Sequence, residues 1–168
     1  MSPLANSYRS GPSMALKMDG IGATSTMLRD AAARGEDMRP AMARIRDLLI
    51  EGNKKQFATQ GSFLGTPWPA SSPETLARKA RAGILPSLSA SLVASGDLEQ
   101  SLSGGKGGRT RVSKGSVSVG TSLFYAIFAI GGASGGRRGT EPARPPLGIN
   151  EAERLTSLRI MTDYLLGL

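Results

Sequence analysis

The stretch "RPAMARIRDLLIEGNKKQFATQ" (residues 39–60) carries the longest helical signal in the chain. Pro40 suits the first turn of a helix, where a backbone N–H has no intrahelical partner, and Asp37 lies near the expected cap. Large apolar side chains recur at roughly helical spacing with charges between them: Ile45, Leu48, Leu49 and Phe57. The pattern predicts a long amphipathic helix with its apolar face on the core.

A second helix is predicted at the other end of the chain, over residues 150–168. Asn150 is a favourable N-cap, and Glu153, three residues on, completes the pattern of a capping box. The large side chains that share one face of this helix give it the amphipathic pattern of a packed helix: Leu155, Leu158, Met161 or Thr162, and Leu165.

Two shorter helices are predicted from their start and stop signals. Residues 24–35 ("TSTMLRDAAARG") begin with Ser and Thr and end with glycine. Residues 71–83 ("SSPETLARKARAG") begin with a serine cap, a proline in the first turn and Glu74 soon after. Between the helices, Trp68 is flanked by two prolines, which places it on a turn.

A β-hairpin is predicted over residues 110–121 ("TRVSKGSVSVGT"). Val112, Val117 and Val119 alternate with polar residues, and Lys114 is followed by a glycine between the two halves. Such alternation is typical of strands with one face on a core and one in water.

Other segments leave their structure open or carry weaker signals. Residues 95–102 ("SGDLEQSL") fit a short helix or the start of a strand, and residues 122–132 ("SLFYAIFAIGG") fit a helix or a buried strand. Residues 15–20 alternate like a short strand. Altogether we expect one α+β domain over residues 15–168, with helices packed on a small antiparallel sheet, long basic and glycine-rich loops, and a flexible arm at residues 1–14.

The composition argues against an enzyme. The chain has 168 residues with 22 glycines and 10 prolines, but no cysteine and no histidine. Disulfides, thiolate nucleophiles and the commonest general base and metal ligand are therefore excluded. The acidic residues lie on expected helix surfaces or caps, without the spacing of a metal site. We expect no catalytic activity, no cofactor and no metal.

Two further classes of site lack their defining features. The glycine-rich residues 103–110 ("SGGKGGRT") do not have the spacing of a Walker A loop, and Lys106 is followed by glycine rather than Ser or Thr. The longest uncharged run, residues 115–136, has an apolar part of only eight residues, whereas a spanning helix needs about 20. We expect a soluble, intracellular protein without membrane contact.

The basic residues are unevenly spread. The net charge is +8, and residues 104–140 contain six basic residues and no acidic one. The six are Lys106, Arg109, Arg111, Lys114, Arg137 and Arg138. Contact with phosphates needs only reachable Lys and Arg, but no recognition helix or interleaved aromatic platform accompanies them. Such a balance of charge favours contact with nucleic acid or with an acidic protein surface.

The stretch "TEPARPPLG" (residues 140–148) places three prolines around one arginine. Pro142, Pro145 and Pro146 fix the direction of the chain where ladder hydrogen bonds are not available. Arg144 is thereby held in place, and its planar fork can bind a carboxylate or backbone carbonyls. Two interpretations stay open: an internal brace that ties this strut to the last helix, and a contact with another subunit.

The order of these motifs resembles the phage virion morphogenesis family, the tail-completion or neck proteins that include the G protein of phage Mu and are similar to the lambda minor tail protein Z. The resemblance covers roughly residues 40–168. Its motif positions are Phe57, Trp68, Thr75, Leu92, Ser95, Gly96, Leu98, Ser101, Val117 to Gly120, Tyr125, Ala126, Gly131 and Pro142 to Gly148. The chain departs from the family where a histidine usually follows "YA", here Phe128 or its neighbour, and where Pro146 replaces an aromatic residue. These departures leave the framework of the motifs intact.

The resemblance implies a structural assembly protein of the virion. Such proteins sit at the head–tail junction or upper tail, after assembly in the host cytoplasm, and form rings. The implied partners are other copies of the chain, with a hexamer expected, and connector, tail-terminator and tail-tube proteins, with non-specific contact to packaged DNA as a further option. On this resemblance, the six basic residues are expected to contact an acidic neighbouring subunit or the wall of a DNA channel. The motif residues Trp68, Gly96, Tyr125, Pro142, Arg144, Pro145 and Gly148 are expected to serve the architecture. The alternative is a small basic accessory protein that binds DNA without sequence preference.

Overall fold

The computed structural model describes residues 21–83, 96–132 and 142–168. The predicted arm (residues 1–14), the strand predicted at residues 15–20, and Arg137 and Arg138 lie outside the described residues. Nothing in the structure therefore tests these predictions.

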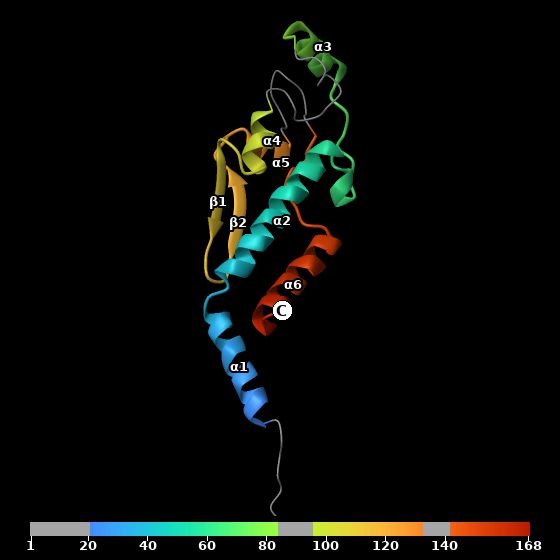
Figure 1. The fold of residues 1–168 in the computed structure, drawn as a ribbon. Helices are drawn as coiled ribbons and strands as arrows, with labels where there is room; N and C mark the ends of the chain where they lie inside the picture. Colours follow the sequence, from blue (N-terminus) through green and yellow to red (C-terminus); the bar gives the residue numbers. More distant parts are fainter. Residues whose placement is uncertain (1–20, 84–95, 133–141) are drawn as a thin grey trace, which may run out of the picture.

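Two long helices form the middle of an elongated molecule. Helix α2 (Arg39–Ala58) and helix α6 (Glu151–Leu166) pack against each other (Figure 1). Helix α1 (Ile21–Glu36) extends from one end of the molecule, and helix α3 (Pro73–Arg81) lies at the other end. All four predicted helices are confirmed, with ends that differ by a few residues from the predicted ones.

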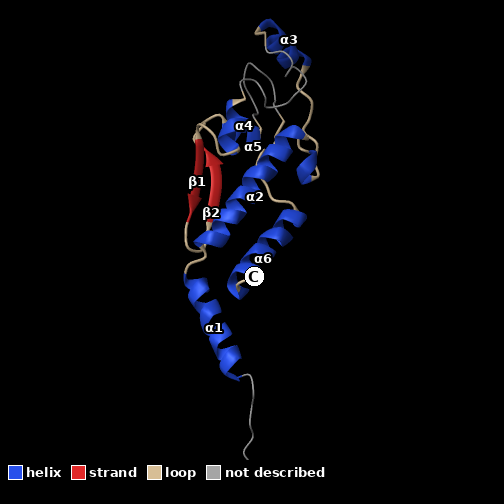
Figure 2. Ribbon diagram, in the orientation of Figure 1, coloured by secondary structure: helices blue, strands red, loops and turns tan. Residues whose placement is uncertain are grey.

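The predicted hairpin is also present. Strands β1 (Gly108–Val112) and β2 (Val117–Thr121) pair antiparallel, with Val112 opposite Val117. The hairpin packs against α2 and against the short helix α4 (Asp97–Leu102) (Figure 2). The α+β class, with helices on a small antiparallel sheet, is confirmed for the described part of the chain.

Both ambiguous segments turn out to be helical. Residues 97–102 form α4, which begins after Gly96 in the left-handed conformation (φ 81°). Ala126–Gly131 form helix α5, with Ala126 and Ala129 buried. The main core joins both helices to the end of α2 and to the turn at Trp68; its residues are Phe57, Trp68, Leu98, Leu102, Ala126 and Ala129.

The capping box of α6 forms as predicted, but only Met161 and Leu165 of the predicted apolar face are partly buried. Asn150 Oδ1 accepts from the Glu153 N–H at 2.8 Å, and a Glu153 carboxylate oxygen accepts from the Asn150 N–H at 3.1 Å. Glu153 and Ser157 are buried, whereas Leu155 is 54% exposed and Leu158 is also exposed. The reason is a close approach: a Cβ at Gly52 of α2 would overlap the Glu153 carboxylate, so this part of α6 faces α2.

The junction between α1 and α2 is anchored by two other elements. The Tyr164 hydroxyl of α6 donates to the Asp37 carbonyl at 2.8 Å, and the Met38 N–H donates to the Lys114 carbonyl of the hairpin turn at 3.0 Å. The Asp37 side chain accepts hydrogen bonds from Arg39, which hold its pKa at about 2. The C-terminal end of α1 is thereby fixed to the body of the molecule.

Candidate assembly surface

The proline-rich strut is an internal brace, and its partner differs from the predicted one. The Arg144 side chain is buried and donates to the carbonyls of Pro69 at 2.9 Å and Ala70 at 3.2 Å. Its backbone N–H donates to the Ala129 carbonyl at 2.7 Å. The arginine fork therefore binds backbone carbonyls, one of the two kinds of partner expected for it, in the connection between α2 and α3. The brace interpretation had named the last helix instead.

A second set of bonds holds the same strut to α2 and to Trp68. The Trp68 indole N–H and the Gln56 side-chain amide both donate to the Pro145 carbonyl, each at 3.2 Å. Pro146 is fully buried, and a Cβ at Gly148 would lie 2.5 Å from a methyl carbon of Leu64. Backbone carbonyls freed by the prolines thus receive side-chain donors, which satisfies the buried acceptors.

Replacing Arg144 by Lys is expected to lower the free energy of unfolding by about 1–3 kcal/mol, because the ammonium cannot reproduce the fork that spans two carbonyls. Urea unfolding followed by circular dichroism measures the loss. The matched control is Arg154→Lys on α6, where an exposed arginine pairs with Glu151. The control is expected to change stability by less than about 0.5 kcal/mol; equal effects of both variants would contradict the brace.

The structure also describes the positions of three further motif residues: Gly96, Tyr125 and Pro142. Gly96 supplies the left-handed conformation before α4. Tyr125 precedes α5 and its ring lies edge-on to that of Phe124, with ring centres 5.9 Å apart. Burial, and secondarily the charge of Asp97, raises the pKa of Tyr125. Pro142 is exposed at the start of the described part of the strut.

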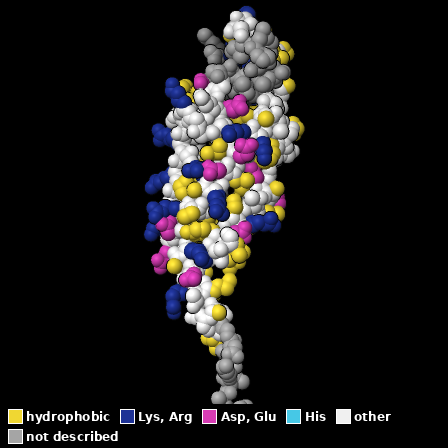
Figure 3. Space-filling view, viewed as in Figure 1, with side chains coloured by type: hydrophobic (Ala, Val, Ile, Leu, Met, Phe, Trp, Pro, Cys, Tyr) yellow, Lys and Arg dark blue, Asp and Glu magenta, His cyan; other side chains and the backbone are white. Residues whose placement is uncertain are grey.

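The basic residues of the hairpin share an outward surface. Arg109 and Arg111 lie two residues apart in β1, so their side chains stand on the same face of the hairpin. Both are exposed, as are Lys106 before the strand and Lys114 in the turn. We call these four residues the basic hairpin face. In Figure 3, Lys and Arg side chains follow one another along the edge of the molecule where the hairpin lies.

Large apolar side chains on α1 and around α5 are exposed, in addition to Leu155 and Leu158 of α6, and the sequence patterns did not predict this exposure. Phe124 is 83% exposed, and Ile127, Phe128 and Ile130 of α5 are also exposed. On α1, Ile21, Met27 and Leu28 are each more than half exposed. Ala126 and Ala129 are three residues apart and face the core, which turns the larger side chains between and after them outward.

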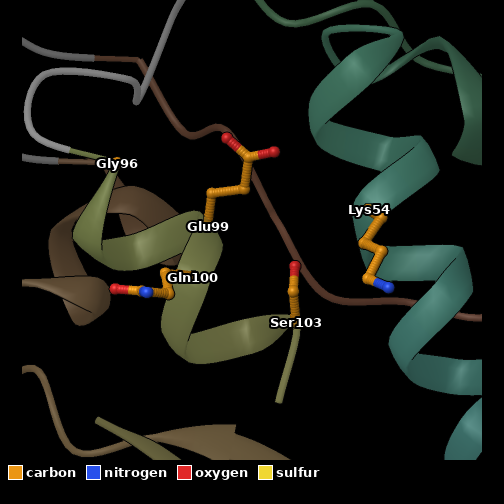
Figure 4. A pocket seen from close by; sticks show the side chains of 5 residues that line it. All are labelled: Lys54, Gly96, Glu99, Gln100 and Ser103. Carbon is orange, nitrogen blue, oxygen red and sulfur yellow. The ribbon is translucent and has the colours of Figure 1, made fainter. Parts of the chain in front are cut away.

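A shallow hollow lies between α2 and the start and end of α4, and it lacks catalytic geometry. Figure 4 shows the residues that line it: Lys54, Gly96, Glu99, Gln100 and Ser103. The Glu99 carboxylate and the Lys54 ammonium point in different directions, and the Ser103 hydroxyl has no hydrogen-bond partner in the described structure. No base lies beside that hydroxyl, so the hollow does not form a nucleophile–base pair.

Two searches of the described residues gave negative results. No group of three or more Asp or Glu side chains lies close enough to hold a metal ion. None of the helices in residues 21–83, 96–132 and 142–168 is both long and apolar enough to cross a membrane.

The braced core, the basic hairpin face and the uncovered apolar side chains describe a domain with surfaces for contact with other molecules. The chain belongs to the phage virion morphogenesis family, whose family model matches residues 20–166. No curated protein sequence and no solved structure gives a significant match. The resemblance is thus confirmed for the family, while the likeness to the Mu G protein and the lambda protein Z stays a prediction. The role of the chain is a structural one in building the phage virion.

Proposed function

We propose that this chain completes the phage tail at the head–tail junction, as a homo-oligomeric ring with six subunits as the expected number. Membership of a virion morphogenesis family supports a structural role in assembly. The observation that carries the proposal is the exposure of seven large apolar side chains on α1, on α5 and just before α5, since a monomer gains nothing from leaving them in water. Its partners would be other copies of itself and connector, tail-terminator and tail-tube proteins in the neck or upper tail.

A phage that lacks this gene tests the proposal. Electron microscopy of the lysate is expected to show filled heads and tails that are not joined, and the wild-type gene supplied in trans is expected to restore joined virions. A lysate with normal virions, or one in which heads fail to form, would contradict a function in tail completion. Flanking capsid, connector and tail-tube genes are also expected.

The second candidate is a basic accessory protein that binds DNA without sequence preference, and the basic hairpin face favours it. Binding to random duplex DNA would be electrostatic and would weaken steeply between 50 and 200 mM salt, by about 10²-fold for the four phosphate contacts that the basic hairpin face can make. The double variant Arg109→Ser with Arg111→Ser is expected to reduce the slope of log affinity against log salt by about 2. The variant with Arg154→Ser and Arg159→Ser removes the same charge from α6 and serves as the control.

The same charge variants separate the two candidates in the phage. Under the tail-completion proposal, replacing Arg109 and Arg111 leaves folding intact and yields unjoined heads and tails, even where the purified protein shows no DNA binding. Normal virion yield with this variant would show that assembly does not require the basic hairpin face. Salt-sensitive DNA binding together with normal heads and tails in the gene deletion would favour the accessory protein.

A further inference from the structure

The exposed side chains around α5 belong to a stretch of sequence without charged residues. From Thr121 to Gly132 the sequence has no Asp, Glu, Lys or Arg. Four large side chains stand outward there: Phe124, Ile127, Phe128 and Ile130. We call these four residues the α5 patch. None of the four carries a charge that could contact a phosphate, so an apolar protein surface suits them better than nucleic acid.

Helix α1 has few packing contacts with the rest of its own chain. No residue from Ile21 to Glu36 is buried, although the helix packs on α6. Its firm attachment lies at its C-terminal end, where the Arg34 side chain donates to the Leu165 carbonyl at 3.0 Å. Helices of this length are marginal in water without tertiary packing. The outer side chains Ile21, Met27 and Leu28 therefore need a second surface.

We infer that α1 of one copy packs on the α5 patch of the next copy. The two surfaces match in length: Ile21 to Leu28 rises about 10 Å, and the six residues of α5 rise about 9 Å. They also match in charge, because the four charged residues of α1 balance one another and the α5 patch has none. Both surfaces are apolar and otherwise uncovered in the described structure.

The positions of the two surfaces set the kind of assembly. In Figure 1, α1 extends from one end of the elongated molecule, and α5 lies beside α4 in the half that carries α3. Contact between two different surfaces is heterologous, and heterologous contacts close into rings or continue as filaments. The inference rests on the ring proposed above and assigns the pair of surfaces that would build it. The inner Ala126 and Ala129 fix α5 to the core, so the patch is held in place.

Two single variants and their mixture test the inference. Leu28→Asp damages the α1 surface and Phe128→Asp damages the α5 patch; both side chains are more than half exposed, so circular dichroism is expected to show a folded chain. Mass photometry or sedimentation is expected to show an oligomer for the wild type and a monomer for each variant, with association at least tenfold weaker. An equimolar mixture is expected to give a dimer with one copy of each and nothing larger, since each pair retains one intact contact.

Leu155→Asp is the matched control, because Leu155 is as exposed as Phe128, at 54%, but lies on α6 outside both surfaces. This control is expected to keep the wild-type oligomer. A monomeric wild type, dimers of either variant alone, or a mixture that stays monomeric would each overturn the inference. Should Leu28→Asp and Phe128→Asp both support normal virions while the gene deletion leaves heads and tails unjoined, the inference fails and the proposed function stands. A deletion without an assembly defect would overturn the proposed function itself.

Discussion

Replacing Trp68 by Ala is expected to lower the free energy of unfolding by about 3–5 kcal/mol. The indole is buried and meets the Phe57 ring edge-on, with ring centres 5.3 Å apart. Its N–H also donates to the Pro145 carbonyl. The substitution therefore opens a cavity in the main core and removes one bond of the strut. Urea unfolding at a fixed chain concentration measures the loss, followed by far-ultraviolet circular dichroism because Trp68 is the chain's only tryptophan.

The conservative variant Trp68→Phe separates the two contributions. Phenylalanine keeps an aromatic ring against Phe57 but has no N–H for the Pro145 carbonyl, which still accepts from Gln56. We expect a loss of about 1–2 kcal/mol, the sum of one neutral hydrogen bond and a smaller ring. A loss below about 1 kcal/mol for Trp68→Ala would show that the turn is not part of the cooperative core.

Several side chains from distant parts of the sequence form hydrogen bonds with the proline-rich strut. Each proline removes a backbone donor, so the strut cannot join the hairpin or a helix by ladder bonds. Side chains from elsewhere replace those bonds: Gln56 and Trp68 reach the Pro145 carbonyl, and Arg144 reaches back to Pro69 and Ala70. The result fixes the entry to α6 and the start of α3 relative to the core. We infer that this rigidity holds the outer surfaces at set positions for assembly.

Features with local causes were predictable from the sequence. The capping box of Asn150 and Glu153 and the serine cap of α3 depend on residues three apart in the chain, and both form. The hairpin follows from alternation over a few residues around Lys114. In each case the chain's own neighbours supply the partner, so no knowledge of the tertiary contacts was needed.

Features that depend on distant contacts were not predictable. Leu155 and Leu158 of α6 were expected to be packed, but the close approach of Glu153 to Gly52 leaves both side chains exposed. The presence of Gly52 in α2 does not by itself tell which residue of another helix approaches it. The partner of Arg144 was likewise missed, since Pro69 lies 75 residues away. For the candidate site, the sequence located the basic residues but not the α5 patch, because a short apolar run reads as core in the absence of its neighbours.

Gly61→Ala is expected to lower the free energy of unfolding by about 2–5 kcal/mol. Gly61 ends the turn after α2 with a φ of 95°, a conformation that costs an L-residue about 1–2 kcal/mol. A Cβ there would also lie 2.6 Å from the Thr66 carbonyl oxygen and 2.7 Å from the Trp68 backbone nitrogen. Backbone atoms cannot turn aside as a flexible side chain can, so the overlap adds about 1–3 kcal/mol. Thermal or urea unfolding measures the sum.

Gly65 offers the control that isolates the overlap from the conformation. It has nearly the same backbone conformation, with a φ of 89°, at the other end of the same short 3₁₀ turn (Ser62–Leu64), and a Cβ there would meet nothing within 4 Å. Gly65→Ala should therefore show the conformational cost alone, about 1–2 kcal/mol. The excess loss in Gly61→Ala then measures how firmly the Trp68 turn is held. The hydrogen bonds between the strut and this turn are expected to provide that rigidity. Equal losses at the two glycines would mean that the turn yields, and that the strut does not fix Trp68 against α2.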